Sequence, residues 1–122
     1  MPRTPVIFYR EDDGSVPVLE WLLALPVKAQ DKCRVRLERL RECGHELRRP
    51  EADYLRDDIR ELRVRLGTVN YRMLYFFHGQ VAAVVSHGLV KEDVVPAREI
   101  ELARQRRLKF LSAPRQHSAE SV

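Results

Sequence analysis

Residues 59–87 read IRELRVRLGTVNYRMLYFFHGQVAAVVSH, and this stretch decides the predicted fold. Apolar and charged side chains alternate over residues 59–66, which is typical of a strand with one buried face. The segments 71–77 and 80–87 are rich in the aromatic and β-branched residues that strands favour. Turn-forming residues separate the three runs, Gly67 to Asn70 at the first break and His78-Gly79 at the second. We therefore predict three antiparallel strands in a meander.

The alternation assigns the side chains of this meander to two faces. The face expected to contact the core carries seven apolar residues: Leu62, Val64, Leu66, Tyr71, Met73, Tyr75 and Phe77. Arg63, Arg65 and Arg72 lie on the other face. If Leu66 and Tyr71 close the first hairpin, Arg65 stands opposite Arg72. If His78-Gly79 is a two-residue turn, His87 falls diagonally beside Arg72.

The predicted register gathers three guanidinium groups and one imidazole at one end of the sheet. Like charges directly opposite each other destabilise a sheet, so a bound anion would favour this cluster. Lys91 lies just beyond the end of the third strand. The alternative is that Glu61, on the same face as Arg63, together with water, neutralises the cluster without any ligand. Both interpretations stay open from the sequence.

The segments around the meander predict further elements. Residues 4–9 form a short apolar strand, residues 16–26 a short helix, residues 27–43 a second helix that ends before Gly44, and residues 96–110 a last helix. The polar segment 112–122 has no periodicity, and we expect a disordered tail there. Residues 1–111 are predicted to form a single α+β domain.

The composition of the chain excludes several classes of function. The chain has 122 residues and a net charge of +4, and 18 of its 22 basic residues are arginine, which suits phosphate recognition. It has no apolar run long enough to cross a membrane and no signal peptide, so we expect a soluble, cytoplasmic protein with no membrane partner. Cys33 and Cys43 are too few for a disulfide framework. Motifs for metal or nucleotide binding do not occur, and we expect neither a metal nor a cofactor.

Four groups of residues carry a resemblance to a known family. They are Glu61-Leu62-Arg63, Tyr71-Arg72-Met73-Leu74-Tyr75-Phe76-Phe77, His87-Gly88-Leu89-Val90-Lys91, and Pro96-Ala97-Arg98-Glu99-Ile100 with Ala103 and Arg106. Leu40, Gly44 and Leu47 fit a further pattern at the end of a helix. In this order and spacing they resemble the phage-derived, HigB-like branch of the RelE/ParE toxin superfamily. The similarity spans about residues 18–109.

The resemblance implies a RelE-like fold, with an N-terminal strand and a two-helix hairpin packed on a small antiparallel sheet, and a C-terminal helix. It also implies the toxin of a type II toxin–antitoxin pair, a metal-independent mRNA endoribonuclease acting on the ribosome. Its partners would be mRNA, the ribosome and a helix-turn-helix antitoxin. The family's Tyr-Arg pair assigns a catalytic role to Arg72, and the basic residue after the last strand assigns one to Lys91.

The chain departs from the family pattern beside this site. Family members usually have adjacent lysines where this chain has Lys91-Glu92-Asp93, and the segment before Pro96 is one residue shorter. Two acidic residues replace cations here, which weakens the attraction for phosphate. The resemblance therefore leaves two other functions open. One is a non-enzymatic, ParE-like inhibitor of DNA gyrase, and the other is a phage-derived binding protein that has lost toxicity.

The residues of the cluster suggest roles in RNA cleavage. The 2′-hydroxyl attack needs cations for the phosphate, a base and an acid. Arg63 and Arg65 are predicted to bind RNA, and Arg72 to stabilise the phosphate. Of this cluster, His87 has the ordinary pKa closest to 7, so it is the acid–base candidate, and packing in the core is its alternative. The family resemblance implies that the ribosome supplies part of the site. The sequence leaves the oligomeric state open.

The same register leads to an expectation about a partner. Leu74, Phe76, Val81, Ala83 and Val85 are predicted to share the face that carries Arg72. A sheet with two apolar faces needs a cover on the second one. The C-terminal helix is expected to cover part of it through Ile100, Ala103 and Leu108, and an antitoxin helix to cover the rest. The alternative is that the protein's own helices cover the whole face.

Overall fold

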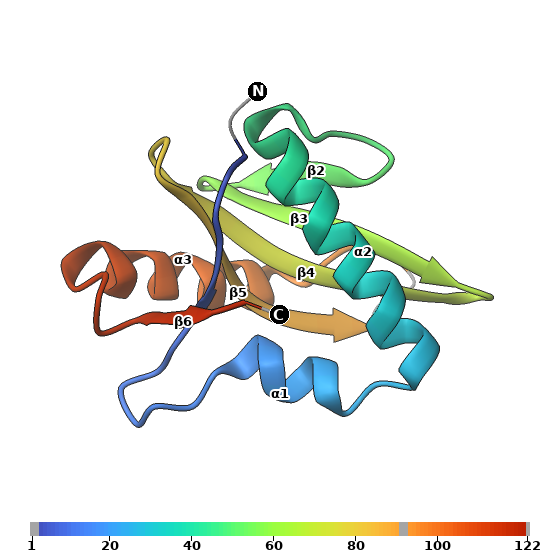
Figure 1. Cartoon of the computed structure of the whole chain (residues 1–122), viewed down its shortest axis with the longest axis horizontal. Helices are drawn as coiled ribbons and strands as arrows, with labels where there is room; N and C mark the ends of the chain where they lie inside the picture. Colours follow the sequence, from blue (N-terminus) through green and yellow to red (C-terminus); the bar gives the residue numbers. More distant parts are fainter. Residues whose placement is uncertain (1–2, 91–92, 122) are drawn as a thin grey trace.

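In the computed structural model, residues 3–90 and 93–121 are described. A mixed sheet of six strands has the order β2-β3-β4-β5-β1-β6. The strands are β1 (Val6–Tyr9), β2 (Ala52–Arg56), β3 (Ile59–Leu66), β4 (Val69–His78), β5 (Ala82–Val90) and β6 (Ser118–Glu120); the helices are α1 (Pro17–Leu23), α2 (Val27–Cys43), the one-turn 3₁₀ helix η1 (Gly44–Glu46) and α3 (Ala97–Ser112). Helices α1 and α2 lie on one face of the sheet and α3 lies on the other (Figure 1). The predicted α+β class is confirmed.

The larger core lies between the sheet and the two N-terminal helices. Leu62, Val64, Met73 and Tyr75 point into it, as the alternation of the sequence predicts. From the helices, the largest fully buried side chains in this core are Leu22, Leu37 and Leu40. Helix α2 occupies the predicted residues. It ends at Cys43, before Gly44, whose φ of 53° suits glycine and where a Cβ atom would lie 2.3 Å from Thr4 Oγ1.

The second face of the sheet is covered by the protein's own helix α3. A separate core contains Leu74, Phe76 and Val84 of the sheet against Ile100, Ala103 and Phe110 of α3. The predicted contact through Leu108 is wrong, since this side chain is 50% exposed. The expectation that an antitoxin helix must cover this face therefore loses its structural basis.

The registers of both hairpins differ from the predicted ones. The first turn is the two residues Gly67-Thr68, because Leu66 pairs with Val69, so Arg63 rather than Arg65 stands opposite Arg72. This shift of two residues leaves every side chain of β3 on its predicted face. In the second hairpin, His78 pairs with Ala82.

A β-bulge interrupts the pairing of β4 with β5. Tyr75 pairs with Val85 and Leu74 with His87, so Ser86 is the extra residue. Because of the longer turn, Ala83 and Val85 point into the α1–α2 core, which corrects their predicted placement on the face of Arg72. Val81, predicted on that face as well, lies in the turn and is 64% exposed.

Two strands are absent from the sequence-based prediction. Strand β2 extends the meander, and β6 pairs antiparallel with β1, which itself runs parallel to β5. The sheet is therefore larger than expected and mixed. The expectation of a disordered tail is corrected for the described residues 112–121, because Ser112 ends α3 and residues 118–120 form β6 beside β1 (Figure 1).

Candidate functional site

The centre of the candidate site is a buried carboxylate between two arginines on neighbouring strands. Arg63 and Arg72 are direct partners across β3 and β4. Glu61, only 1% exposed, accepts a hydrogen bond of 2.7 Å from Nη1 of Arg72 and one of 3.1 Å from Nε of Arg63. Two like charges on paired positions repel each other, and the shared carboxylate compensates for this repulsion. We call Glu61, Arg63 and Arg72 the arginine pair cluster.

Further ion pairs connect this cluster to strand β2. Arg63 donates to Asp53 over 3.3 Å, and Arg49 donates to the same carboxylate over 2.9 Å. The hydrogen bond from Arg49 is the main cause that lowers the pKa of Asp53. These contacts fix the Arg63 side chain at both ends of its guanidinium group. The cluster is thus held rigidly, as a binding site requires.

Two hollows open beside the arginine pair cluster, and Arg63 and Arg72 line both. The α2-side hollow, with a volume of about 460 Å³, is lined by Arg36, Pro50, Glu51, Arg63, Val64, Arg65, Asn70, Tyr71 and Arg72. The α3-side hollow, about 530 Å³, is lined by Asp53, Leu55, Glu61, Arg63, Arg72, Asp93, Val94 and Val95. The first hollow has four arginines against one carboxylate, whereas the second has three carboxylates against two arginines. An anion is therefore favoured in the α2-side hollow.

Helix α2 contributes Arg36, a cation that is not among the predicted site residues. Arg36 lines the α2-side hollow and lies 3.7 Å from Glu51, which also accepts hydrogen bonds of 2.9 and 3.0 Å from Arg39. The bonds from Arg39 lower the pKa of Glu51. One signal was available in the sequence: Lys32 and Arg36 are four residues apart and share a side of the helix. Lys32 donates to the carbonyl of Arg65 over 3.3 Å, which joins this side to β3.

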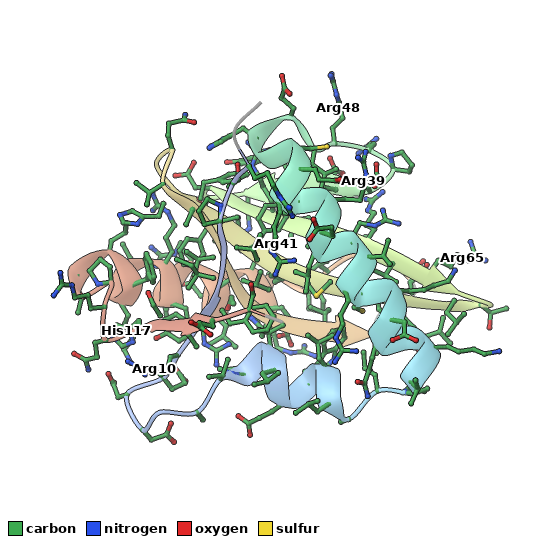
Figure 2. All side chains as sticks on the ribbon, viewed as in Figure 1. Arg10, Arg39, Arg41, Arg48, Arg65 and His117 are labelled. Carbon is green, nitrogen blue, oxygen red and sulfur yellow. The ribbon has the colours of Figure 1, made fainter. Side chains whose placement is uncertain are left out.

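Arg65 differs from the other two predicted arginines. It is exposed on the β3–β4 hairpin beside α2 (Figure 2), and its Nε donates to the carbonyl of Gly67 over 3.0 Å. Within residues 3–90 and 93–121 it forms no ion pair with a carboxylate. Its cross-strand partner is Asn70. Arg65 is therefore the most accessible cation of the α2-side hollow.

His87 shares the sheet face of Arg72 but lines neither hollow. It is 7% exposed, and its ring lies between Ser86 Oγ at 2.7 Å from Nδ1 and Glu99 Oε1 at 3.0 Å from Nε2. Burial, aided by the positive charge of Arg106, lowers the pKa of His87, although Glu99 acts in the opposite direction. The structure places this imidazole beneath α3, as the packing alternative describes.

Lys91, the third predicted catalytic residue, lies outside the described residues, as does Glu92. Asp93 is described and lines the α3-side hollow beside Arg63 and Arg72. Of the predicted site residues, the structure therefore brings Arg63, Arg65 and Arg72 together in the α2-side hollow.

The described part of the chain contains no group of three metal-ligating side chains that could hold a metal ion. Among its helices, none is both long enough and apolar enough to span a bilayer.

Comparison with known proteins identifies the family of this chain. No curated protein is significantly similar to this chain. The family model described as phage-derived protein Gp49-like (DUF891) matches residues 20–108, which is most of the chain and includes α2, the arginine pair cluster and most of α3. The chain belongs to this Gp49-like family, a RelE/ParE-type toxin family.

Proposed function

We propose that this protein is the toxin of a type II toxin–antitoxin pair, in the HigB-like branch, and that it cleaves mRNA on the ribosome without a metal. The observation that supports this most is the α2-side hollow, where four arginines face one carboxylate in a chain of the Gp49-like family. A concave surface with this charge attracts the phosphates of RNA.

The chemistry we propose is attack by a ribose 2′-hydroxyl on the adjacent phosphate. The 2′-oxygen loses its proton and forms a new bond to phosphorus, the bond to the 5′-oxygen breaks, and this oxygen takes a proton from a water molecule. The products carry a 2′,3′-cyclic phosphate and a 5′-hydroxyl. Arg72 and Arg65 stabilise the negative charge on the phosphate as it becomes pentacoordinate. Arg72 uses one nitrogen, Nη1, for Glu61, and a guanidinium has five N–H donors, so the ion pair leaves donors for a phosphate.

The proton transfers require a group other than His87 in the described conformation, because that imidazole is buried between Ser86 and Glu99. Glu51 is the carboxylate that lines the α2-side hollow, and we propose that it accepts the proton of the 2′-hydroxyl. Its lowered pKa makes it a weak base, so most of the rate enhancement would come from the arginines and from groups of the ribosome.

The test is cleavage of mRNA on ribosomes, followed by primer extension and analysis of the RNA ends. The wild type is expected to give 2′,3′-cyclic phosphate ends. Arg65→Gln, which removes an exposed cation, is expected to slow cleavage at least tenfold, whereas the control Arg48→Gln is expected to leave the rate unchanged. Arg48 is exposed and points away from the fold (Figure 2). A folded wild type that produces no cleavage would contradict the proposal.

One observation favours a second candidate function, a binding protein without cleavage. Arg63 and Arg72 are already neutralised by Glu61 and Asp53, and Asp93 adds a third carboxylate to the α3-side hollow. Expression in cells separates the candidates. Growth arrest with intact mRNA indicates an inhibitor of another target, such as the ParE-like inhibition of gyrase, and unaffected growth indicates the binding protein.

We also propose that a helix-turn-helix antitoxin is the partner. Since α3 covers the second face of the sheet, the antitoxin must bind elsewhere. We expect acidic side chains of the antitoxin to contact the arginines of the α2-side hollow. Co-expression with the product of the neighbouring reading frame, followed by size-exclusion chromatography, tests this. A complex that Arg65→Glu weakens would support the contact, and no complex would contradict the partner.

A further inference from the structure

A third hollow lies at the end of the sheet between η1, the β2–β3 and β4–β5 turns and α3, and it has a different chemical character. It has a volume of about 300 Å³, and its walls include Tyr54 of β2, Arg60 of β3, Phe77 of β4, His45 of η1 and the pair Asp58 and Arg107. We call it the aromatic hollow. Arg60 lies three residues before Arg63, about 10 Å along the same strand. Its partner in β4 is Tyr75, so it belongs to the face opposite the arginine pair cluster.

Flat groups line this hollow in series. The rings of His45 and Phe77 are stacked, with centroids 3.6 Å apart and planes inclined by 18°. The guanidinium of Arg60 lies 5.5 Å from the centre of the Phe77 ring and 5.4 Å from that of Tyr54. Tyr54 is 49% exposed. The series therefore ends in an aromatic ring that is available to a further flat group.

The charge of the hollow is positive. Arg60 forms no ion pair with any carboxylate in the part of the chain that the structure describes. Arg107 lies 3.6 Å from Asp58, whose side chain is 70% exposed, so the contribution of this pair to the local potential is small. The arginine beneath the exposed ring thus has its charge available to a ligand.

A ligand for this hollow needs a flat π system and a negative charge. A nucleotide has both, since its base stacks on aromatic and guanidinium planes and its phosphate pairs with arginine. We propose that the aromatic hollow binds one nucleotide of a single-stranded RNA, with the base stacked on Tyr54 and the phosphate beside Arg60. A free nucleotide has the same chemistry and is distinguished in the test below. This inference concerns binding, so its failure leaves the proposed cleavage untouched.

The experiment measures binding of a fluorescent ten-nucleotide RNA by anisotropy, at 50 and 200 mM salt. The RNA carries 2′-O-methyl riboses, which cannot attack the phosphate, so cleavage does not interfere. Tyr54→Leu is expected to weaken binding about 5- to 150-fold, the range for one lost stack. Tyr54→Phe keeps the ring and loses only the contact of its hydroxyl with the backbone N–H of Asp58, so it is expected to bind like the wild type.

Charge is tested separately with a matched pair of arginines. Arg60→Gln is expected to weaken binding and to reduce the slope of log affinity against log salt by about one. Arg48→Gln removes an exposed arginine outside the hollow and is expected to change affinity less than twofold. Tyr54→Leu should leave the salt slope unchanged, because a stack releases no counterions.

A second measurement covers the case in which Tyr54→Leu does not fold. Tyr54→Trp keeps a flat ring, and its fluorescence is expected to be quenched when RNA binds, relative to the signal of Trp21 in the wild type. Binding of adenosine monophosphate alone, lost in Arg60→Gln, would identify a free nucleotide as the ligand. The inference is overturned if Tyr54→Trp shows no quenching, or if Tyr54→Leu and Arg60→Gln bind like the wild type. The cation–π contacts would then serve only to hold β2 on the sheet.

Discussion

Replacing Glu61 by glutamine tests the central contact of the candidate site. The carboxylate is 1% exposed, and both arginines donate to its Oε1, while Nη1 of Arg72 also donates to Oε2 over 3.3 Å. Glutamine has almost the same shape, so the change removes the charge and leaves the packing. Arg72, whose side chain is 13% exposed, then keeps a positive charge without an ion-pair partner among the described residues.

The magnitude follows from the two hydrogen bonds to Oε1. A hydrogen bond to a charged group contributes about 1.5–3 kcal/mol and a neutral one about 1 kcal/mol, so two such replacements should lower the free energy of unfolding by about 2 kcal/mol. Glu61→Ala also leaves a cavity and an unpaired cation, and the expected loss is about 3–5 kcal/mol. Arg63 retains Asp53 in both variants, so the loss comes chiefly from Arg72.

Urea unfolding followed by far-UV circular dichroism measures these values at pH 7. Glu101→Gln is the matched control, because Glu101 also pairs with an arginine, Arg104, but both side chains are about 40% exposed. We expect no measurable loss of stability for this control. The effect at Glu61 should persist at high salt, since buried pairs are screened less than exposed ones. If Glu61→Gln unfolds at the urea concentration of the wild type, the carboxylate does not hold the two arginines and the reasoning is refuted.

Three further predictions concern His87, Cys33 and Gly88. His87→Gln should differ less in stability from the wild type at pH 5 than at pH 7. Burial lowers the pKa of His87 below its ordinary 6.5, so the wild type loses stability as the pH falls below 6.5, whereas glutamine does not titrate. Urea unfolding at both pH values measures the difference in stability. Burial raises the pKa of Cys33 to about 11, so at pH 8 only Cys43 should react quickly with a thiol reagent, and both thiols should react in guanidinium; rapid reaction of two thiols in the native protein would contradict this. Gly88→Ala should lower stability by about 1–3 kcal/mol, because a Cβ atom there would lie 2.2 Å from the Trp21 ring, and an unchanged melting temperature would show that the ring moves aside.

The sequence determines the strands of the meander and their inner face. Leu62, Val64, Met73 and Tyr75 reach the core as predicted, because a period of two leaves only one way to bury them all. The hairpin register is less well determined, since a shift by two residues preserves both faces and changes only the cross-strand partners. Whether Arg63 or Arg65 faces Arg72 therefore depends on the turn.

Other parts of the fold depend on contacts between distant segments. Strand β6 forms because β1 offers it an edge, and no local pattern in residues 118–120 predicts it. The bulge at Ser86 has no signal in the alternation either, since an inserted residue is visible only against the partner strand.

The candidate site shows the same division. The sequence predicts that the arginines of β3 and β4 share one face, and it offers neutralisation by Glu61 as an alternative to a bound anion. Only the tertiary structure decides that this carboxylate is buried, that α3 encloses His87, and that α2 brings Arg36 to the hollow. Burial and the approach of a distant helix depend on packing across the whole chain, whereas alternation along a strand is local.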